Sequence, residues 1–282
     1  MNYNDLESEL NEWIREQRLS EYSRNTLVSY KYAANLFLNF IKDHNLLIDK
    51  ESTIKYKDML ADKYSLATCN KYIIILNKFL KYLKRDDCLL KKFKTQRKTS
   101  LDDPLWPQEH KRMLRWAIKL GMEDMYLIMQ IFALSGARVA ELKYFTVENL
   151  NDNYIIAYNK GKERVLIMRN DLRRMLKKYC EENKITEGYI FRSPVDKKNP
   201  KKIINASTIW RRLKKIAKAA KINPKKIHPH AWRHLFAKAA KEAGIDLDEL
   251  RDILGHSDIR TTAIYTMTSN SEKRKKMEKI KF

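Results

Sequence analysis

Two segments of the chain combine histidine, arginine and tyrosine in patterns that suit chemistry at a phosphate. In HPHAWRH, His230 and Arg233 are three residues apart, so on a helix they share one face. A guanidinium there would neutralise a phosphoryl oxygen while the imidazole moves a proton. In LGHSDIRTTAIYT, His256 precedes Tyr265, whose phenol is either a core group or one presented to a phosphate. A zinc site from His230 and His234 is disfavoured, because no cysteine lies nearby.

Two further motifs carry a cation at a position where it could reach a ligand. In SGARVAEL, Arg138 follows a glycine at the end of an apolar stretch, and Glu141 lies one helical turn later. This pair could aim a cation into a cleft, or it could be an ordinary surface ion pair. The segment 159–162 (NKGK) is a turn whose lysine could contact a phosphate, donate a proton or remain solvated. It is not a Walker A loop, because Glu163 stands where Ser or Thr is required.

The elements that must position these residues are mostly helical. In the first part, apolar residues at helical spacing run from Leu6 to Ile14. Ser23 is expected to cap a second helix with an apolar stripe from Tyr30 to Ile41. A third helix is expected over 68–83, with its lysines largely on the outer face.

A basic segment with no sustained period, broken by Pro104, separates two predicted domains. We predict a helical domain at 1–92, a linker at 93–104 and a second domain at 105–282. In the second domain, a nearly all-apolar helix should end near Gly136, and two β runs (154–158 and 164–168) flank the lysine turn. The chain is expected to be helical again from Asp171, apart from a loop around 192–205. The fold class is therefore mainly α with a small β-hairpin, an α+β arrangement.

The charge balance favours a nucleic-acid partner. The chain of 282 residues has 58 Lys and Arg against 35 Asp and Glu, a net charge of +23. Basic residues occur in every segment, which favours nucleic acid over a generically lysine-rich surface. No apolar run is long enough to span a membrane, and the acidic, polar start is not a signal peptide. Three scattered cysteines without CxxC spacing indicate a reducing compartment, so a cytoplasmic location is expected.

A basic segment at 197–226 contains the strongest candidates for DNA contacts. Ser207 is expected to cap a helix whose apolar face includes Ile209, Leu213 and Ile216. Its outer face could lie in a major groove, or it could be a generic basic surface. The candidates on this helix are Arg211, Arg212, Lys214, Lys215 and Lys218, and those in the first domain are Lys71 and Lys78.

Taken together, the four motifs resemble the conserved boxes of the tyrosine recombinase family, of the phage integrase and Xer type. SGARVAEL resembles T-G-x-R-x-x-E-L, and NKGKER resembles the family's β-hairpin lysine motif. HAWR matches H-x-x-R, and LGHSDIRTTAIYT is close to L-G-H-S-x-x-x-T-T-x-x-Y. Order and spacing match over 105–270, and SRNTLVSYKYAANLFLNFI resembles the family's core-binding domain. Trp232 and Leu235 depart from the usual residues at their positions.

The resemblance implies a role for each matched residue. Tyr265 would be the nucleophile that forms a 3′-phosphotyrosyl bond, on the way to a Holliday junction. Lys160 would be the general acid for the leaving 5′-oxygen, in preference to Lys162, because it precedes Gly161 as in the family's K-G pattern. No metal or other cofactor is implied, and the partners would be double-stranded DNA and a tetramer of the same chain. The remaining roles are phosphate binding by Arg138, Arg233 and His256, proton transfer by His230, and support by Glu141.

Several alternatives remain open at this level. A Xer-like chromosome-dimer resolvase and a mobile-element integrase share this layout. A non-catalytic helix-turn-helix regulator is the rival from another class, because the segment 241–266 can be read as helix, turn and helix. A regulator, however, has no need of Arg138, Lys160 and the His230–Arg233 pair. A type IB topoisomerase shares the chemistry but resembles the boxes less.

Overall fold

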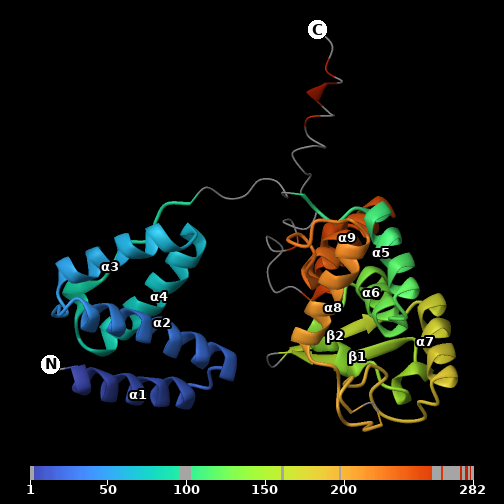
Figure 1. Ribbon diagram of the computed structural model, residues 1–282, viewed down its shortest axis with the longest axis horizontal. Coiled ribbons are helices and arrows are strands. Elements are labelled where there is room, and N and C mark those ends of the chain that lie inside the picture. The colour runs from blue at the N-terminus through green and yellow to red at the C-terminus, as the bar shows by residue number, and fades with distance from the viewer. Residues whose placement is uncertain are drawn as a thin grey trace. The chain divides into compact units, whose positions relative to one another are not determined.

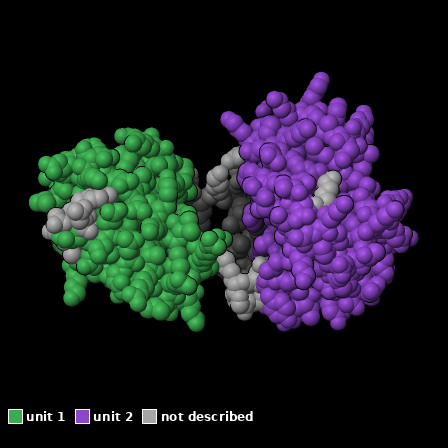
Figure 2. All heavy atoms as spheres, turned by 60° about the horizontal axis from the view of Figure 1, so that its bottom comes forward, with its two compact units in different colours: residues 1–97 green, residues 98–282 purple. Residues whose placement is uncertain are grey.

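The computed structural model describes residues 3–95, 103–159, 162–196 and 198–255, with isolated positions at 262, 274, 277, 278 and 280. The chain forms two compact units, Met1–Arg97 and Lys98–Phe282 (Figure 2). The division falls within the segment predicted as a linker. Within the described residues, none of the helices combines the length and apolarity that a membrane crossing requires.

The first unit packs helices around an aromatic core. Trp13 is buried and stacks on Tyr30 of the next helix, with ring centroids 5.5 Å apart. Ser23 caps that helix as predicted, because its hydroxyl accepts the Thr26 N–H at 3.3 Å. The expected apolar stripe is buried throughout. The elements are α1 (Tyr3–Leu19), α2 (Arg24–Asp43), α3 (Lys50–Lys63), α4 (Leu66–Tyr82) and the short 3-10 helix η1 (Asp86–Cys88) (Figure 1).

Helix α3 was not predicted from the sequence. Its sequence, KESTIKYKDMLADK, is mostly polar, and its large buried side chains are Tyr56 and Leu60. Its beginning carries a recognisable signal, since the Asp49 carboxylate accepts the Ser52 N–H at 2.7 Å. A helix with so narrow an apolar face is stabilised by packing against its neighbours more than by its intrinsic helix propensity.

Helix α6 is the centre of the second unit and packs against α5, α7, α8 and α9. It is the nearly all-apolar helix expected from the sequence, and most of its side chains are buried. It ends at Gly136, as predicted. The unit contains α5 (Pro107–Lys119), α6 (Glu123–Ser135), η2 (Val139–Tyr144), η3 (Glu148–Asn151), β1 (Tyr154–Asn159), β2 (Lys162–Ile167), α7 (Asn170–Glu182), α8 (Ala206–Ala219), α9 (Pro229–Glu242) and α10 (Leu247–Leu254) (Figure 1).

Strands β1 and β2 form the predicted antiparallel hairpin. Tyr154 pairs with Ile167 at its open end, and Asn159 pairs with Lys162 at the other. Alternate residues face the core, so Ile155 and Leu166 are buried. A mainly helical chain with one small sheet among the described residues confirms the predicted fold class.

Two glycines end helices in the left-handed conformation, and neither has room for a side chain. Gly136 ends α6 with φ +60°, and a Cβ there would lie 2.7 Å from Phe236. Gly255 ends α10 with φ +60°, and a Cβ there would lie 2.7 Å from Cδ of Arg164. Glycine is favoured at both positions by its backbone conformation and by the close packing.

Helix α8 begins differently from the prediction. Its N-cap is Asn205, whose side chain accepts the Thr208 N–H at 2.8 Å, and not Ser207. Ser207 lies inside the first turn, and its hydroxyl donates to Asn205 instead. Asparagine and serine cap helices about equally well, so sequence alone did not separate them.

We expect the stability of the second unit to depend on His110. This imidazole is buried and accepts the Trp232 Nε1–H at 3.0 Å, and burial lowers its pKa to about 4. The unfolded chain binds more protons below about pH 6.5, so the free energy of unfolding should fall as pH is lowered from 7 to 5. The variant His110→Gln keeps an amide oxygen that can accept from Trp232. In urea unfolding, its free energy of unfolding should fall between pH 7 and 5 by about 1–2 kcal/mol less than that of wild type. An unchanged pH dependence would contradict this role for His110.

Candidate active site

Arg138 follows the left-handed end of α6 and precedes η2. Its main-chain N–H donates to the Glu141 carboxylate at 2.7 Å, and its Nη1 donates to the other oxygen of that carboxylate at 2.9 Å. Its Nη2 reaches the carbonyl of Gly255 at 3.1 Å. The side chain retains 30% of its exposure. Arg138 is therefore held from two sides and still reaches solvent.

Glu141 is the central acceptor of the site. It is fully buried on η2 and binds Arg164 of β2 as well as Arg138. Arg164 Nη1 donates at 2.6 Å to Oε2, the oxygen that also accepts the Arg138 main-chain N–H. Burial alone would raise the pKa of Glu141, but the charges and hydrogen bonds of Arg164 and Arg138 outweigh it and hold the pKa below its ordinary value. The carboxylate stays ionised and orients two guanidinium groups at once.

Arg233 lies on α9 and is 1% exposed. Its Nη1 donates to the carbonyl of Gly136 at 2.5 Å, and its Nη2 donates to the carbonyl of Leu254. The carbonyls at a helix C-terminus lack intrahelical donors and carry partial negative charge. The ends of α6 and α10 thus provide the acceptors that accommodate a buried cation.

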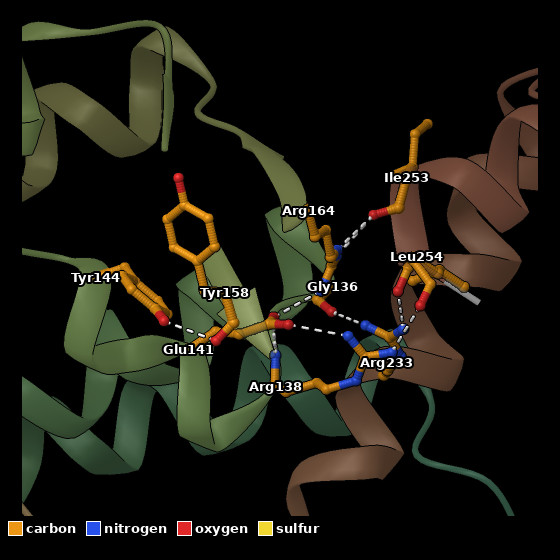
Figure 3. A network of polar contacts seen from close by, with 10 residues as sticks. Gly136, Arg138, Glu141, Tyr144, Tyr158, Arg164, Arg233, Ile253 and Leu254 are labelled. Carbon is orange, nitrogen blue, oxygen red and sulfur yellow. Dashed lines mark hydrogen bonds and ion pairs between the residues drawn. The ribbon is translucent and has the colours of Figure 1, made fainter. Parts of the chain in front are cut away.

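The end of α10 is bound by arginines from three segments that are distant in sequence (Figure 3). Three consecutive carbonyls, each with its own arginine, lie immediately before His256 in the chain. The pairs are Ile253 with Arg164, Leu254 with Arg233, and Gly255 with Arg138.

His230 lies in the first turn of α9, three residues before Arg233, as the spacing predicted. It occupies an exposed position. Desolvation of the ring and the positive charge of Arg233 lower its pKa below the ordinary value for histidine. A lowered pKa favours the neutral imidazole, which is the form that can accept a proton.

Three predicted residues, Lys160, His256 and Tyr265, lie outside the described part of the chain. The flanking residues still show how the neighbouring elements are held. Tyr144 of η2 donates its hydroxyl to the carbonyl of Tyr158 at 2.7 Å, two residues before Lys160 (Figure 3). The 3-10 helix η2 carries both Glu141 and Tyr144, so it connects the Glu141 cluster to the β-hairpin.

The candidate DNA-contacting residues on α8 divide into two kinds. Arg212 was predicted to face outward, and this is wrong: it forms a partly buried ion pair with Asp124 at the start of α6, where its Nη2 donates at 2.6 Å. Position 212 faces α6 because α8 packs against that helix. The remaining candidates are exposed, namely Arg211, Lys214, Lys215 and Lys218.

In the first unit, Lys71 is exposed on α4, whereas Lys78 is partly buried. The ammonium of Lys78 donates to the Tyr30 hydroxyl at 2.7 Å and lies 5.1 Å from the ring centroid of Tyr22. These contacts raise the pKa of Lys78, chiefly through the hydrogen bond to Tyr30. Lys78 thus has contacts within the unit, and Lys71 has the more accessible charge.

Arg164 is the residue of this site that the sequence analysis missed. It lies on β2, on the same face as the buried Leu166, and its side chain is 4% exposed. A charged residue at an inward position of a strand is a signal, because a buried charge requires a partner. Strand alternation could therefore have identified it, although not its partners.

No group of three or more side chains able to ligate a metal ion occurs among the residues that the structure describes. His230 and His234 lie on one face of α9 without a third ligand in that part of the chain.

Comparison with known proteins gives a consistent result. The family model described as "Phage integrase family" matches residues 104–272. A tyrosine recombinase of Pseudothermotoga lettingae is 27% identical over 91% of this chain and 91% of the relative. Tyrosine recombinase XerA of Pyrococcus horikoshii is 27% identical over 96% and 93%, and XerD of Oceanobacillus iheyensis is 29% identical over 86% and 88%.

Solved structures show the same fold. A crystal structure of XerA recombinase covers 100% of both chains at 26% identity, with a TM-score of 0.53. A lambda integrase dimer bound to a COC′ core site matches 92% of this chain and 76% of that chain, with a TM-score of 0.72 at 16% identity. The family model covers more than half of the chain, and the relatives extend over both units. The chain belongs to the phage integrase family of tyrosine recombinases, enzymes that cut and rejoin DNA strands in site-specific recombination.

Proposed function

We propose that this enzyme exchanges DNA strands through a covalent 3′-phosphotyrosyl intermediate at Tyr265 and a Holliday junction. Attack on a phosphodiester builds negative charge on the non-bridging oxygens. Arg138, Arg233 and His256 stabilise that charge without a metal. Lys160 protonates the leaving 5′-oxygen, and His230 assists proton transfer. The phosphotyrosyl bond conserves the energy of the broken diester, so no ATP is consumed.

The observation that carries this proposal is the set of arginines at the end of α10. Arg138 and Arg233 come from different segments, yet they bind the carbonyls of adjacent residues, Arg138 that of Gly255 and Arg233 that of Leu254. The next residue in the chain is His256, and Tyr265 follows nine residues later. Preorganised cations beside the segment that bears the nucleophile are what transition-state stabilisation requires.

We further propose that the enzyme acts as a tetramer on double-stranded DNA. The exposed basic residues of α8, together with Lys71 of α4, would contact the duplex. The net charge of +23 supports a strongly salt-dependent affinity. Of the two readings within the family, we propose the Xer-type resolvase, because Xer relatives match along nearly the whole of both chains.

A suicide duplex tests this function. A nick close to the scissile phosphate releases a short fragment after cleavage, so the phosphotyrosyl complex cannot religate and accumulates. An SDS-resistant adduct on a candidate chromosomal site is expected. A duplex from a mobile-element end provides the comparison. Preferential cleavage of that duplex would show that the enzyme is an integrase and not a resolvase. Tight binding with no adduct on either duplex would favour the helix-turn-helix regulator.

Arg138→Ala and Arg233→Ala should each slow single-turnover cleavage by about 100-fold or more, the scale for losing one preorganised charge stabiliser. Lysine should restore neither, because it lacks the planar fork that spans Glu141 and Gly255, or Gly136 and Leu254.

Arg169→Ala is the matched control, since this arginine lies in the same unit and, among the described residues, forms its ion pair with the nearby Asp171 at an exposed position. It should cleave at the wild-type rate. Melting temperatures measured in parallel confirm that each variant is folded. Cleavage near the wild-type rate by Arg138→Ala or Arg233→Ala would remove that arginine from the site.

A further inference from the structure

Arg164 is a buried cation with two sets of contacts. Its Nη1 binds Glu141 at 2.6 Å, and its Nε and Nη2 both bind the carbonyl of Ile253, at 2.9 and 2.7 Å. One end of this guanidinium therefore contacts the carboxylate that orients Arg138. The other end contacts the last turn of α10, three residues before His256 (Figure 3).

We propose that Arg164 is a positioning residue for strand cleavage, and this proposal rests on the function proposed above. It fixes Glu141, and through it Arg138, against the C-terminus of α10, from which the chain continues to His256 and Tyr265. It would act through its protein partners and not at the phosphate, because Nε, Nη1 and Nη2 of its guanidinium are all engaged by Glu141 and the Ile253 carbonyl.

The surroundings of Arg164 fit this role. A carbonyl in the last turn of a helix lacks an intrahelical donor, and Ile253 obtains two N–H groups from Arg164. The absence of a side chain at Gly255 gives Arg164 its space, since a Cβ there would approach its Cδ to 2.7 Å. Any other residue at 255 would thus displace the guanidinium as well as strain the helix end.

The charge arrangement also explains why this position needs arginine. Glu141 is shared by two guanidinium groups, and the pair with Arg164 is the more buried one. Without Arg164, the carboxylate would be neutralised by Arg138 alone, and the Ile253 carbonyl would lose both donors. Lysine could replace the charge but could not bridge the carboxylate and the carbonyl in one plane.

The test compares Arg164→Lys with wild type on a nicked suicide duplex under single-turnover conditions, well below the melting temperature of both proteins. Duplex affinity should stay unchanged, whereas the cleavage rate should fall by about 30-fold, as expected when catalytic groups are displaced by a fraction of an ångström. Wild type must form the adduct in the same experiment, and its failure to do so would count against the proposed function rather than against Arg164.

A second substrate separates positioning from partial unfolding. A methylphosphonate at the scissile position has one charged non-bridging oxygen fewer, so it depends less on Arg138. The defect of Arg164→Lys should shrink to about threefold on this substrate, as should that of Arg138→Ala, because both act on the same developing charge. A reduced folded fraction would instead slow both substrates by the same factor.

Arg192→Lys is the matched control. Arg192 is another arginine of this unit that binds main-chain carbonyls, those of Tyr189 and Glu187, and these lie in its own loop and not at the end of α10. It should cleave both substrates at the wild-type rate. If Arg164→Lys also cleaves the diester like wild type, or shows equal defects on the two substrates, Arg164 is a structural residue and the proposal is wrong.

A second variant covers the case in which a buried lysine beside Glu141 unfolds the unit. Replacing both members of a buried ion pair often preserves stability, whereas removing one destabilises. The double variant Glu141→Gln/Arg164→Met should therefore fold and bind DNA, but, with both rates normalised to the folded fraction, it should cleave the diester more slowly than Glu141→Gln alone. Cleavage as fast as that of Glu141→Gln would show that Arg164 only neutralises Glu141, which overturns the proposal.

Discussion

Replacement of Tyr265 by phenylalanine is expected to abolish the covalent protein–DNA complex and leave duplex affinity nearly unchanged. The substitution removes a single hydroxyl, the group that would attack the scissile phosphorus, and keeps the aromatic ring for packing. Loss of the nucleophile leaves no slower route to the same adduct, so the expected effect is the largest of any single substitution in this chain.

The measurement is an SDS gel of the suicide-duplex reaction, with affinity taken from an electrophoretic shift of the intact duplex. Tyr154→Phe is the matched control, because Tyr154 lies exposed on β1 and has no part in the proposed chemistry. It should form the adduct as wild type does. An SDS-resistant adduct from Tyr265→Phe would place the nucleophile elsewhere.

Lys160→Ala is expected to slow cleavage of an ordinary diester by about 1,000-fold, within the range for loss of a general acid. The same variant should cleave a bridging 5′-phosphorothiolate at nearly the wild-type rate. A thiolate is a good leaving group and needs little or no proton, so it bypasses the missing lysine. Arg138→Ala should stay slow on both substrates, because charge on the non-bridging oxygens still requires stabilisation.

Lys162→Ala, measured in parallel, decides which lysine of the hairpin is the acid. Lys162 begins β2 and pairs with Asn159, so it lies across the hairpin from the last residue of β1. If sulfur substitution rescues Lys162→Ala and not Lys160→Ala, the assignment is wrong by two residues. If it rescues neither variant, the general acid lies outside the hairpin and these lysines serve as phosphate contacts.

The two proposals make separable statements about the arginines. The proposed function needs Arg138 and Arg233 at the phosphate, and Arg164 is needed only if their placement depends on the end of α10. If wild type forms the adduct and Arg164→Lys cleaves at the wild-type rate, the proposed function stands and the positioning role of Arg164 is refuted. The methylphosphonate comparison therefore reports on placement, and the phosphorothiolate comparison reports on proton transfer.

Much of the secondary structure of this protein can be predicted from local sequence. The alternation of apolar residues on either side of an NKGK turn predicts the β-hairpin, and the apolar run before Gly136 predicts α6 and its end. The spacing of His230 and Arg233 predicts that they share a face of α9. Periodicity and caps act over a few residues, so they can be read before the chain is folded.

The tertiary structure decided which charges are paired. Arg212 follows the same basic pattern as its neighbours on α8, yet it faces Asp124, which is 88 residues away in sequence. Lys78 belongs to the basic face of α4, yet it contacts two tyrosines of the first unit. Neither contact has a local signature, because each depends on which helices pack together.

The network at the end of α10 is the clearest case of this division. The motif SGARVAEL indicated that Glu141 supports Arg138, and that contact spans three residues. The partnership of Arg164 with Ile253 spans 89 residues, and it exists because β2 packs against α10. Sequence alone supplied the residues that suit phosphate chemistry, whereas folding brought the helix ends, the shared carboxylate and the third arginine together, because buried charges must find partners wherever the packed chain provides them.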